Sequence, residues 1–416
     1  MADELTGGPP WCPACLWGLD AWDPAALPAR GFARVGRWGY RRGWQVDAEV
    51  RAALLRDPDS ATAVTPHAAL VAISAVVITV AMATLLVIPL VWRSELLPPV
   101  KLVATLGLLV VVAWAWPQLG RLPKGPQRLR DGEAVGLRTI VAQVAAAVGT
   151  EPPDEILIDV TCVNLSVDRV GLRQRSVLRI GMPLWLSLTP QMRVAMLAHA
   201  LGHLVNDHPT RGLLTRPALD LFRRAVDWTG GERPFDRLER RFDDVEPMPF
   251  FTQVVYVVLA VLGSIAAAAQ LAIDSLAMPE SRRAELAADL VARRVAGSAA
   301  FLGALDRVLM LDELWSALVY DVERLTPDRW ESESLAVHER RLRPQLELLR
   351  QGSIRATDLW SRHPAVGQRA WLVEALPEQP AQVVIEPRLW AAADAELANL
   401  AKAVHRTVLD TREFTG

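Results

Sequence analysis

The sequence predicts a mostly helical α+β protein that is anchored in a membrane by an N-terminal transmembrane helical hairpin. Two observations predict the hairpin, because residues 68–92 and residues 102–120 each lack a charged side chain. A third predicts the α+β part: short alternating runs at 155–160 and 177–181 lie among longer segments with helical apolar spacing. A chain of 416 residues is long enough for two or three domains.

The charge and the cysteine content exclude two classes of protein. A net charge of −2 without a cluster of basic residues argues against a nucleic-acid-binding protein. The cysteines Cys12, Cys15 and Cys162 are too few and too unevenly spaced for a disulfide framework. Cys12-Pro-Ala-Cys15 has the turn of a zinc knuckle, but a structural zinc site needs four ligands. We interpret it as a degenerate or unmetallated knuckle in a reducing compartment.

Residues 1–66 are predicted to form a cytoplasmic module that is rich in Trp and Arg. No signal peptide is expected, because the acidic residues Asp3 and Glu4 occupy positions where a signal peptide carries basic residues. Tryptophans spread among Gly and Pro favour a small loop-rich module or an interfacial layer against the membrane. A short helix is expected near residues 46–55. Lysine fills only three of the 45 basic positions, which with the Ala and Leu richness is typical of a GC-rich bacterial genome.

The predicted hairpin covers residues 67–120. Its first uncharged run of 25 residues crosses a hydrocarbon layer of roughly 30 Å, and its second run is slightly short. A buried hairpin in a soluble domain is the alternative, but it would normally show a polar face. Arginines precede the first run and follow the second, whereas the turn carries only Arg93 and Lys101. We therefore expect a multi-pass protein of the bacterial cytoplasmic membrane with both ends of the hairpin in the cytoplasm.

Residues 121–416 are predicted to form a second domain that an apolar segment interrupts. It begins with a helix at 135–148, which ends at Gly149, followed by the two strands. Thr189 in the cap position and Pro190 at the first helical position start a helix that runs to about Asn206. A strand just before such a helix can offer its edge to an extended peptide.

Two pairs of potential ligands lie on predicted helices. His199 and His203 are four residues apart, so both imidazoles share one face, as in zinc sites that take two ligands from one helix. Glu285 and Asp289 are also four apart, on a helix that starts near residue 281. Each pair alone is more often an ordinary structural or surface pair.

Residues 250–273 form a third uncharged run. If Glu285 is to reach the metal of the two histidines, both helices must lie on the same side of the membrane. A single crossing of the membrane by residues 250–273 would place Glu285 on the opposite side from the histidines. The segment at 213–228 is too charged to be a compensating span. We therefore predict a re-entrant hairpin at Gly263-Ser264, or a helix lying partly in the membrane with one side on the protein. Further helices are predicted at residues 305–325, 335–349 with a bend at Pro344, 368–376 and 387–409.

The order of these features resembles one known family. A capped helix with two histidines, an apolar segment, a helix with Glu285 and Asp289, and the turn His363-Pro364 occur in the order found in membrane-embedded zinc metallopeptidases of the HtpX and CAAX-prenyl-protease type. The resemblance covers roughly residues 68–376. It implies a zincin-like fold and zinc-dependent hydrolysis of peptide bonds in membrane or membrane-proximal proteins.

The resemblance also implies roles for individual residues. His199, His203 and Glu285 would be ligands of one Zn²⁺ ion, with a fourth position open for water. Asp289 would orient a liganding histidine. Asn164 falls at the substrate-side strand, and His363 would either stabilise an oxyanion or hold the site together. The implied partners are a protein or peptide substrate and membrane lipid.

Ala200 departs from the family pattern His-Glu-x-x-His, in which the Glu is the general base. Alanine cannot take a proton from zinc-bound water, so this chain is expected to bind zinc and peptide with little or no turnover. Because all other ligand positions are intact, an engineered Glu-to-Ala change is favoured over a natural pseudoprotease. The alternative is a non-catalytic membrane protein that binds or regulates a partner.

Overall fold

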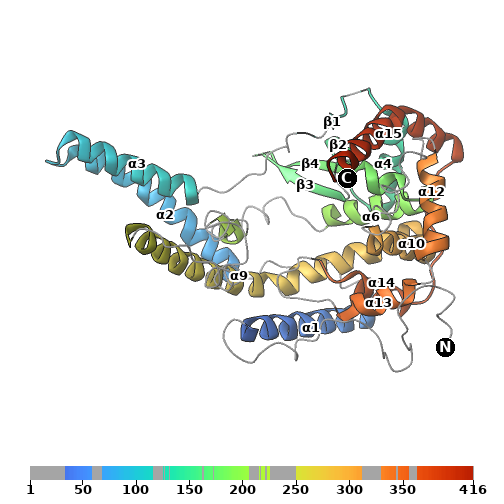
Figure 1. The fold of residues 1–416 in the computed structure, drawn as a ribbon, viewed down its shortest axis with the longest axis horizontal. Helices are drawn as coiled ribbons and strands as arrows, with labels where there is room; N and C mark the ends of the chain where they lie inside the picture. The colour runs from blue at the N-terminus through green and yellow to red at the C-terminus, as the bar shows by residue number, and fades with distance from the viewer. Residues whose placement is uncertain are drawn as a thin grey trace.

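The computed structural model describes most of the chain. The described residues are 33–58, 68–115, 125, 127–130, 132–161, 164–171, 173–205, 215, 217–220, 223–224, 250–311, 329–342, 345–355 and 363–415; for residues 33–36, 114–115, 250–264, 267, 331, 341–342, 355 and 408–415 only the backbone is described. Within them the chain is mostly helical, with one small sheet (Figure 1). The predicted α+β class is therefore confirmed at this coarse level.

The sheet has four strands in the order β1-β2-β4-β3. The central strands β2 (Glu155–Asp159) and β4 (Arg175–Gly181) are parallel, and β1 (Gln127–Arg128) and β3 (Leu165–Val170) add antiparallel edges. The bounds of β2 and β4 match those of the two predicted strands, 155–160 and 177–181, to within two residues. Strand β3 was not predicted, because the alternation that runs from Leu165 to Asp168 is broken at Arg169, where an apolar residue would continue it.

Helices α4 (Val135–Val148), α5 (Met182–Leu186) and α6 (Pro190–Val205) pack with this sheet around one hydrophobic core. The bounds of α4 are as predicted, and Gly149 ends the helix with a φ of 90°, a conformation that glycine adopts without a steric cost. The first residue of α6 is the predicted Pro190. The core therefore fixes α6, which carries both histidines.

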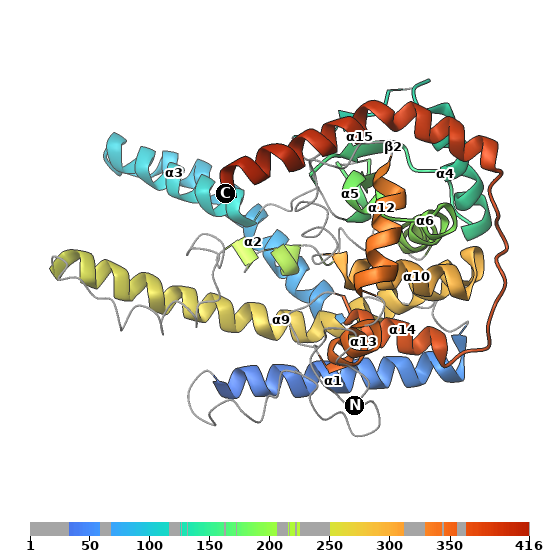
Figure 2. The same ribbon diagram turned by 45° about the vertical axis from the view of Figure 1, so that its right-hand side comes forward.

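A C-terminal helix, α15 (Pro387–Thr415), lies across the sheet domain (Figure 2). Its Glu396 carboxylate accepts hydrogen bonds from the backbone N–H groups of Gly136 and Leu137, at 2.9 and 3.2 Å. It thereby caps the first turn of α4, whose own preceding residue, Ala134, provides no side-chain cap. Helix α15 thus stabilises the first helix of the domain through Glu396.

Helix α9 (Phe250–Ala296) is a single continuous helix of 47 residues. The predicted hairpin at Gly263-Ser264 is therefore wrong, because the helix passes through both residues without a break. A lone glycine costs only about 1 kcal/mol in a helix, which long flanking runs of helix-forming residues outweigh. The alternative, a helix lying partly in the membrane, stays a prediction.

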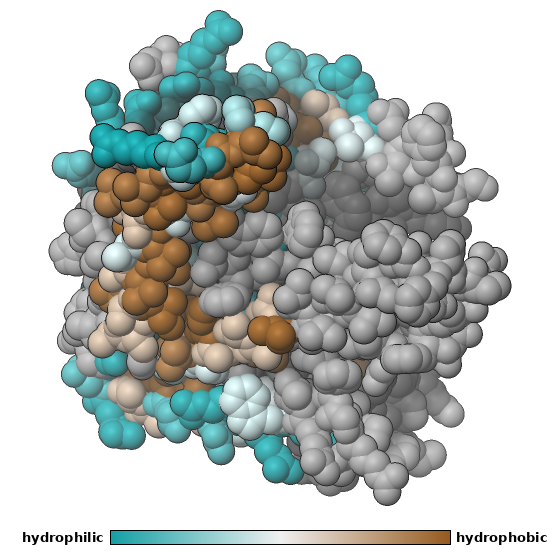
Figure 3. All heavy atoms as spheres, turned by 90° about the vertical axis from the view of Figure 1, so that its left-hand side faces the viewer, coloured by the Kyte–Doolittle hydropathy of each residue, from teal (hydrophilic) through white to brown (hydrophobic). Residues whose placement is uncertain are grey.

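Helices α2 (Ala68–Arg93) and α3 (Pro98–Ala115) lie side by side and project from the same side of the molecule as the first half of α9 (Figures 1 and 2). Many of their large apolar side chains are exposed, and they gather in one band on that side (Figure 3). Among the described helices, α2 alone is long and apolar enough to cross a membrane by length and composition. The second span of the predicted hairpin and the multi-pass topology stay predictions.

The remaining helices surround the C-terminal half of α9. They are α10 (Ser298–Leu309), α12 (Trp330–Val337) with a following π-helical turn (His338–Leu342), α13 (Leu346–Arg355) and α14 (Val366–Glu374). The helix predicted at 335–349 falls on the end of α12, the π-helical turn and the start of α13, and Pro344, where a bend was predicted, lies outside the described residues. The distal part of the helix predicted at 305–325 lies outside the described residues.

Helix α1 (Ala33–Arg56) is longer than the predicted short helix at 46–55 and packs along α9 and α14. Leu54 of α1 lies in a small hydrophobic cluster with Leu286 and Leu290 of α9 and with Leu372 of α14. Cys12, Cys15 and Cys162 lie outside the described residues, so the degenerate zinc knuckle stays a prediction.

Candidate metal centre

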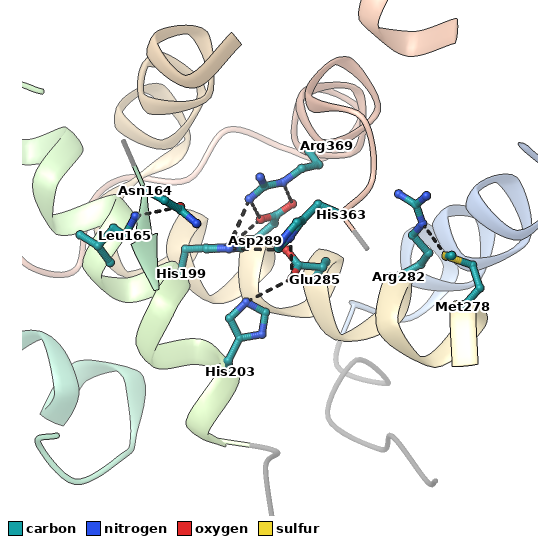
Figure 4. Close-up of polar contacts among 10 residues, drawn as sticks. All are labelled: Asn164, Leu165, His199, His203, Met278, Arg282, Glu285, Asp289, His363 and Arg369. Carbon is teal, nitrogen blue, oxygen red and sulfur yellow. Dashed lines mark hydrogen bonds and ion pairs between the residues drawn. The ribbon is translucent and has the colours of Figure 1, made fainter. Parts of the chain in front are cut away.

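The two histidines project from α6 toward α9. His199 is buried and His203 is half-buried, and their ring centroids lie 5.0 Å apart (Figure 4). The spacing of four residues on a helix accounts for their common face.

Glu285 lies on α9, opposite both histidines. Its Oε2 atom is 3.7 Å from Nε2 of His199, and its Oε1 atom is 3.5 Å from Nε2 of His203. The possible ligand atoms of these three residues all lie within 4.8 Å of one another. The structure therefore brings together the three residues predicted as ligands.

The close approach of α6 and α9 depends on small residues at their crossing. A Cβ atom built on Gly202 would lie 3.2 Å from Cα of Ala288 and 3.4 Å from Cβ of Val291. Gly202 immediately precedes His203, and Ala288 lies between Glu285 and Asp289. The glycine thus sets the distance between the ligands of the two helices.

We expect Gly202→Leu to separate α6 from α9. The added side chain has no space at the crossing, and overpacking of this kind costs about 1–3 kcal/mol. The variant should therefore show a lower unfolding temperature and a weaker affinity for metal in a calorimetric titration. Gly107→Leu is the matched control, because nothing lies within 4 Å of the Cβ position of Gly107 on α3. Equal metal affinities in the two variants would contradict the role of the crossing.

Asp289 fixes the orientation of His199. Its Oδ1 atom lies 2.9 Å from Nδ1 of His199, so Nδ1 carries the proton and donates to the carboxylate. The unprotonated Nε2 atom then faces Glu285. This tautomer is the one that a metal ion requires.

Arg369, on α14, completes a buried network around Asp289. Its guanidinium donates to both carboxylate oxygens, from Nε to Oδ2 at 2.9 Å and from Nη2 to Oδ1 at 2.6 Å. Asp289 is fully buried and Arg369 is nearly so. Bidentate pairing of this kind satisfies both charges in a site from which water is excluded.

The network holds the carboxylates ionised. Burial would raise the pKa of Asp289, but the charge and hydrogen bonds of Arg369 and the hydrogen bond from His199 lower it well below its usual range. Burial likewise opposes ionisation of Glu285, yet the hydrogen bond from His363 and the charges of His203 and His199 lower its pKa to about 2. Two carboxylates therefore stay charged at neutral pH.

His203 is neutral at neutral pH. Burial lowers its pKa to about 4, the charge of His199 acts in the same direction, and the opposing effect of Glu285 is smaller. A neutral imidazole is the form that binds a metal, so no proton has to leave His203 first.

His363 contacts the site from its edge. Its side chain is largely exposed, and its Nδ1 atom lies 2.9 Å from Oε1 of Glu285. Of the two predicted roles, this contact favours holding the site together, because the imidazole is positioned against a ligand carboxylate.

The distances between these atoms fit a metal ion better than they fit hydrogen bonds. Ligand atoms about 2.1 Å from a tetrahedral zinc ion lie roughly 3.4 Å from one another. Nε2 of His199 lies 3.7 Å from Oε2 of Glu285 and Nε2 of His203 lies 3.5 Å from Oε1, so each imidazole faces a different oxygen, at a distance close to that value and too long for a good hydrogen bond. Oε2 of Glu285 is buried and has no hydrogen-bond partner among the described residues. A buried carboxylate oxygen that faces an imidazole and has no hydrogen-bond partner is one that a cation would satisfy.

Two further predicted positions lie close to the histidines. Ala200 is 1% exposed and belongs to the main hydrophobic core. Asn164 is exposed at the start of the edge strand β3, where its side-chain oxygen accepts a hydrogen bond from the backbone N–H of Leu165 at 2.8 Å (Figure 4).

Arg369 has no predicted role from the sequence. An arginine five residues after His363-Pro364 has no recognisable signature by itself, since arginine is common throughout this chain. Its role depends on the packing of α14 against α9, which brings the guanidinium beside Asp289.

Comparisons with known proteins do not identify a family. No protein-family model, no curated protein and no solved structure matches the chain.

Proposed function

We propose that the chain is a membrane-attached zinc protein with the site of a metalloendopeptidase, which in this form lacks its general base. One observation carries the proposal: the buried Oε2 atom of Glu285 has no hydrogen-bond partner among the described residues and faces Nε2 of His199, while Nε2 of His203 faces the other oxygen of the same carboxylate. Two imidazoles and one carboxylate are the ligands of many catalytic zinc sites, which keep a fourth position for water. The proposed fold of the domain is zincin-like.

The residues around this site have separable tasks. When bound, Zn²⁺ would polarise a carbonyl group and acidify its water. Asp289 keeps His199 in the correct tautomer, Arg369 neutralises Asp289, and His363 donates to Glu285. Ala200 has no group that takes a proton, so peptide hydrolysis is expected to be very slow or absent.

Strand β3 supports a peptide as the bound molecule. Within the described sheet it pairs with β4 alone, so its outer edge can form backbone hydrogen bonds with an extended segment. Asn164, at the start of this strand, lies near the histidine helix, which β3 contacts. An extended peptide substrate would thus pair with the outer edge of β3 and pass beside the proposed metal site.

The apolar helices support attachment to a membrane. The hydroxyl groups of Thr79 and Thr84 in α2 donate to backbone carbonyls four residues earlier, so neither needs water. The indole N–H of Trp92 donates to Thr105 and links α2 to α3. We propose that both helices form a transmembrane hairpin of a bacterial cytoplasmic membrane, with the metal site on the cytoplasmic side.

A second candidate is a natural pseudoprotease that binds or regulates a membrane partner. The burial of Ala200 favours it, because Ala200 is 1% exposed and belongs to the main hydrophobic core, where an ionised glutamate would lose its hydration. An engineered Glu-to-Ala change would leave a position adapted to a larger side chain.

Metal analysis of the purified protein tests the proposal. We expect one zinc ion per chain, and we expect His199→Ala to reduce the affinity by more than the roughly 10–100-fold that loss of an outer-shell partner causes. His405→Ala on α15 and the pair Cys12→Ser and Cys15→Ser are controls that should retain the ion. Zinc that remains in His199→Ala and disappears with the two cysteines would overturn the proposal.

A further inference from the structure

Helix α1 consists of two halves with different chemistry. Residues 33–46 contain four arginines, two tryptophans and a tyrosine but no acidic residue, whereas residues 47–56 carry both acidic residues of the helix. The first half is therefore strongly cationic and rich in the aromatic residues that favour a membrane interface.

The second half is fixed against the helices of the metal site. Asp47 pairs with Arg282 of α9 at 3.3 Å, and both side chains are buried. Arg51 donates to Gln368 of α14 at 3.1 Å, and its Cζ atom lies 3.8 Å from the ring centroid of Trp371. These contacts set the position of the whole helix.

The two helices run in the same direction. Val46 packs with Met278, Asp47 pairs with Arg282, and Leu54 packs with Leu286 and Leu290, so position along α1 increases with position along α9. The cationic half of α1 therefore extends beside the stretch of α9 that precedes Met278. There the sequence of α9 changes from the uncharged run 250–273 to charged residues that begin at Asp274. Figures 1 and 2 show α1 beneath this part of α9.

The face of this half that is turned away from α9 is cationic and aromatic. Gly39 and Gly43 are buried, whereas Arg41 is exposed and Trp38 is 48% exposed. Arg37 and Arg42 are partly exposed, and the rings of Tyr40 and Trp44 stack with centroids 6.5 Å apart. Arginines and tryptophans on one face, at the level where a neighbouring helix stops being apolar, match the headgroup region of a bilayer.

We propose that residues 33–46 of α1 bind the anionic headgroups of a phospholipid bilayer. The inference rests on the proposed membrane attachment of α2 and α3 but not on the metal or on hydrolysis. The charge complementarity selects anionic phospholipid, because a zwitterionic surface offers no net attraction to Arg37, Arg41 and Arg42.

The test uses the full chain in neutral detergent, titrated with micelles that contain phosphatidylglycerol or phosphatidylcholine. Binding is followed by calorimetry, and hydrogen exchange locates the protected backbone amides. We expect tighter binding to phosphatidylglycerol, slower exchange at residues 33–46, and loss of the preference at high salt. The triple variant Arg37→Gln, Arg41→Gln and Arg42→Gln should lose about 100-fold in affinity for phosphatidylglycerol.

Two variants control for charge and position. Replacing Arg37, Arg41 and Arg42 by Lys should retain binding, whereas replacing the exposed Arg173, Arg388 and Arg406 by Gln removes the same charge elsewhere and should change nothing. Equal loss in this control, equal protection by phosphatidylcholine, or equal protection by inorganic phosphate would overturn the inference. Insertion into phosphatidylcholine vesicles is measured separately: a chain that fails to insert but still binds phosphatidylglycerol through α1 contradicts the membrane attachment and not the lipid site.

Discussion

Ala200→Glu is expected to produce zinc-dependent cleavage of a peptide or of the chain itself, at a rate about 10²–10⁴-fold above that of the chain with alanine. A carboxylate next to His199 on α6 can take a proton from water at the metal and return it to the leaving amine, which alanine cannot do. The ligands and the carboxylate network are already in place. The measurement is cleavage of a fluorogenic peptide library in the presence and absence of a zinc chelator.

Ala200→Gln is the matched control for this experiment. Glutamine has nearly the size of glutamate and places the same demand on the packed position of Ala200, but it has no basic carboxylate. Activity of the glutamate variant alone supports an inactivated peptidase. Stable, zinc-loaded and inactive protein with either side chain would support the pseudoprotease.

Arg369→Leu is expected to destabilise the protein by about 3–5 kcal/mol, because it leaves the fully buried Asp289 carboxylate without its cationic partner. The remaining hydrogen bond from His199 does not neutralise that charge. Asp289 then takes up a proton or draws in water, and His199 loses its fixed orientation. We expect a large decrease in the unfolding temperature together with weaker zinc binding.

The double variant Asp289→Leu and Arg369→Leu separates charge from packing. Replacing both members of a buried ion pair by apolar groups is often nearly neutral for stability, so the double variant should be more stable than Arg369→Leu alone. It should still bind zinc weakly, because His199 has lost its partner. A double variant less stable than the single one would show that Arg369 stabilises the fold by packing and not by its charge. Arg388→Leu, at an exposed position, controls for the loss of an arginine and should change stability by about 0.5 kcal/mol or less.

Local patterns predicted the bounds of α4 and the start of α6, and they singled out three residues that the structure brings together as a possible metal site. The apolar spacing gave the bounds of α4, and the Thr189-Pro190 signal gave the start of α6. His199 and His203 could be paired because two residues four apart on a helix share a face, whereas Glu285 was assigned to the same site from the resemblance to the metallopeptidases. Their mutual distance could not be predicted, since it depends on how closely α6 approaches α9 at Gly202.

Features that depend on long-range packing were not predictable. The continuity of α9 through Gly263-Ser264 depends on the whole of a 47-residue helix and not on the local glycine. Arg369 acquires its role only from the contact of α14 with α9, 80 residues away in sequence from Asp289. The length of α1 was underestimated because Gly39 and Gly43 weaken the helical pattern, although both are buried in the structure.

The central claim is that one Zn²⁺ ion is bound by His199, His203 and Glu285. X-ray absorption spectroscopy of the zinc-loaded full chain tests it most directly. We predict a first shell of nitrogen and oxygen only, at about 2.0–2.2 Å, with the outer scattering of two imidazole rings that falls to one ring in His203→Ala. Sulfur at about 2.3 Å would place the ion at the cysteines and contradict the claim, as would a shell of oxygen atoms without imidazole.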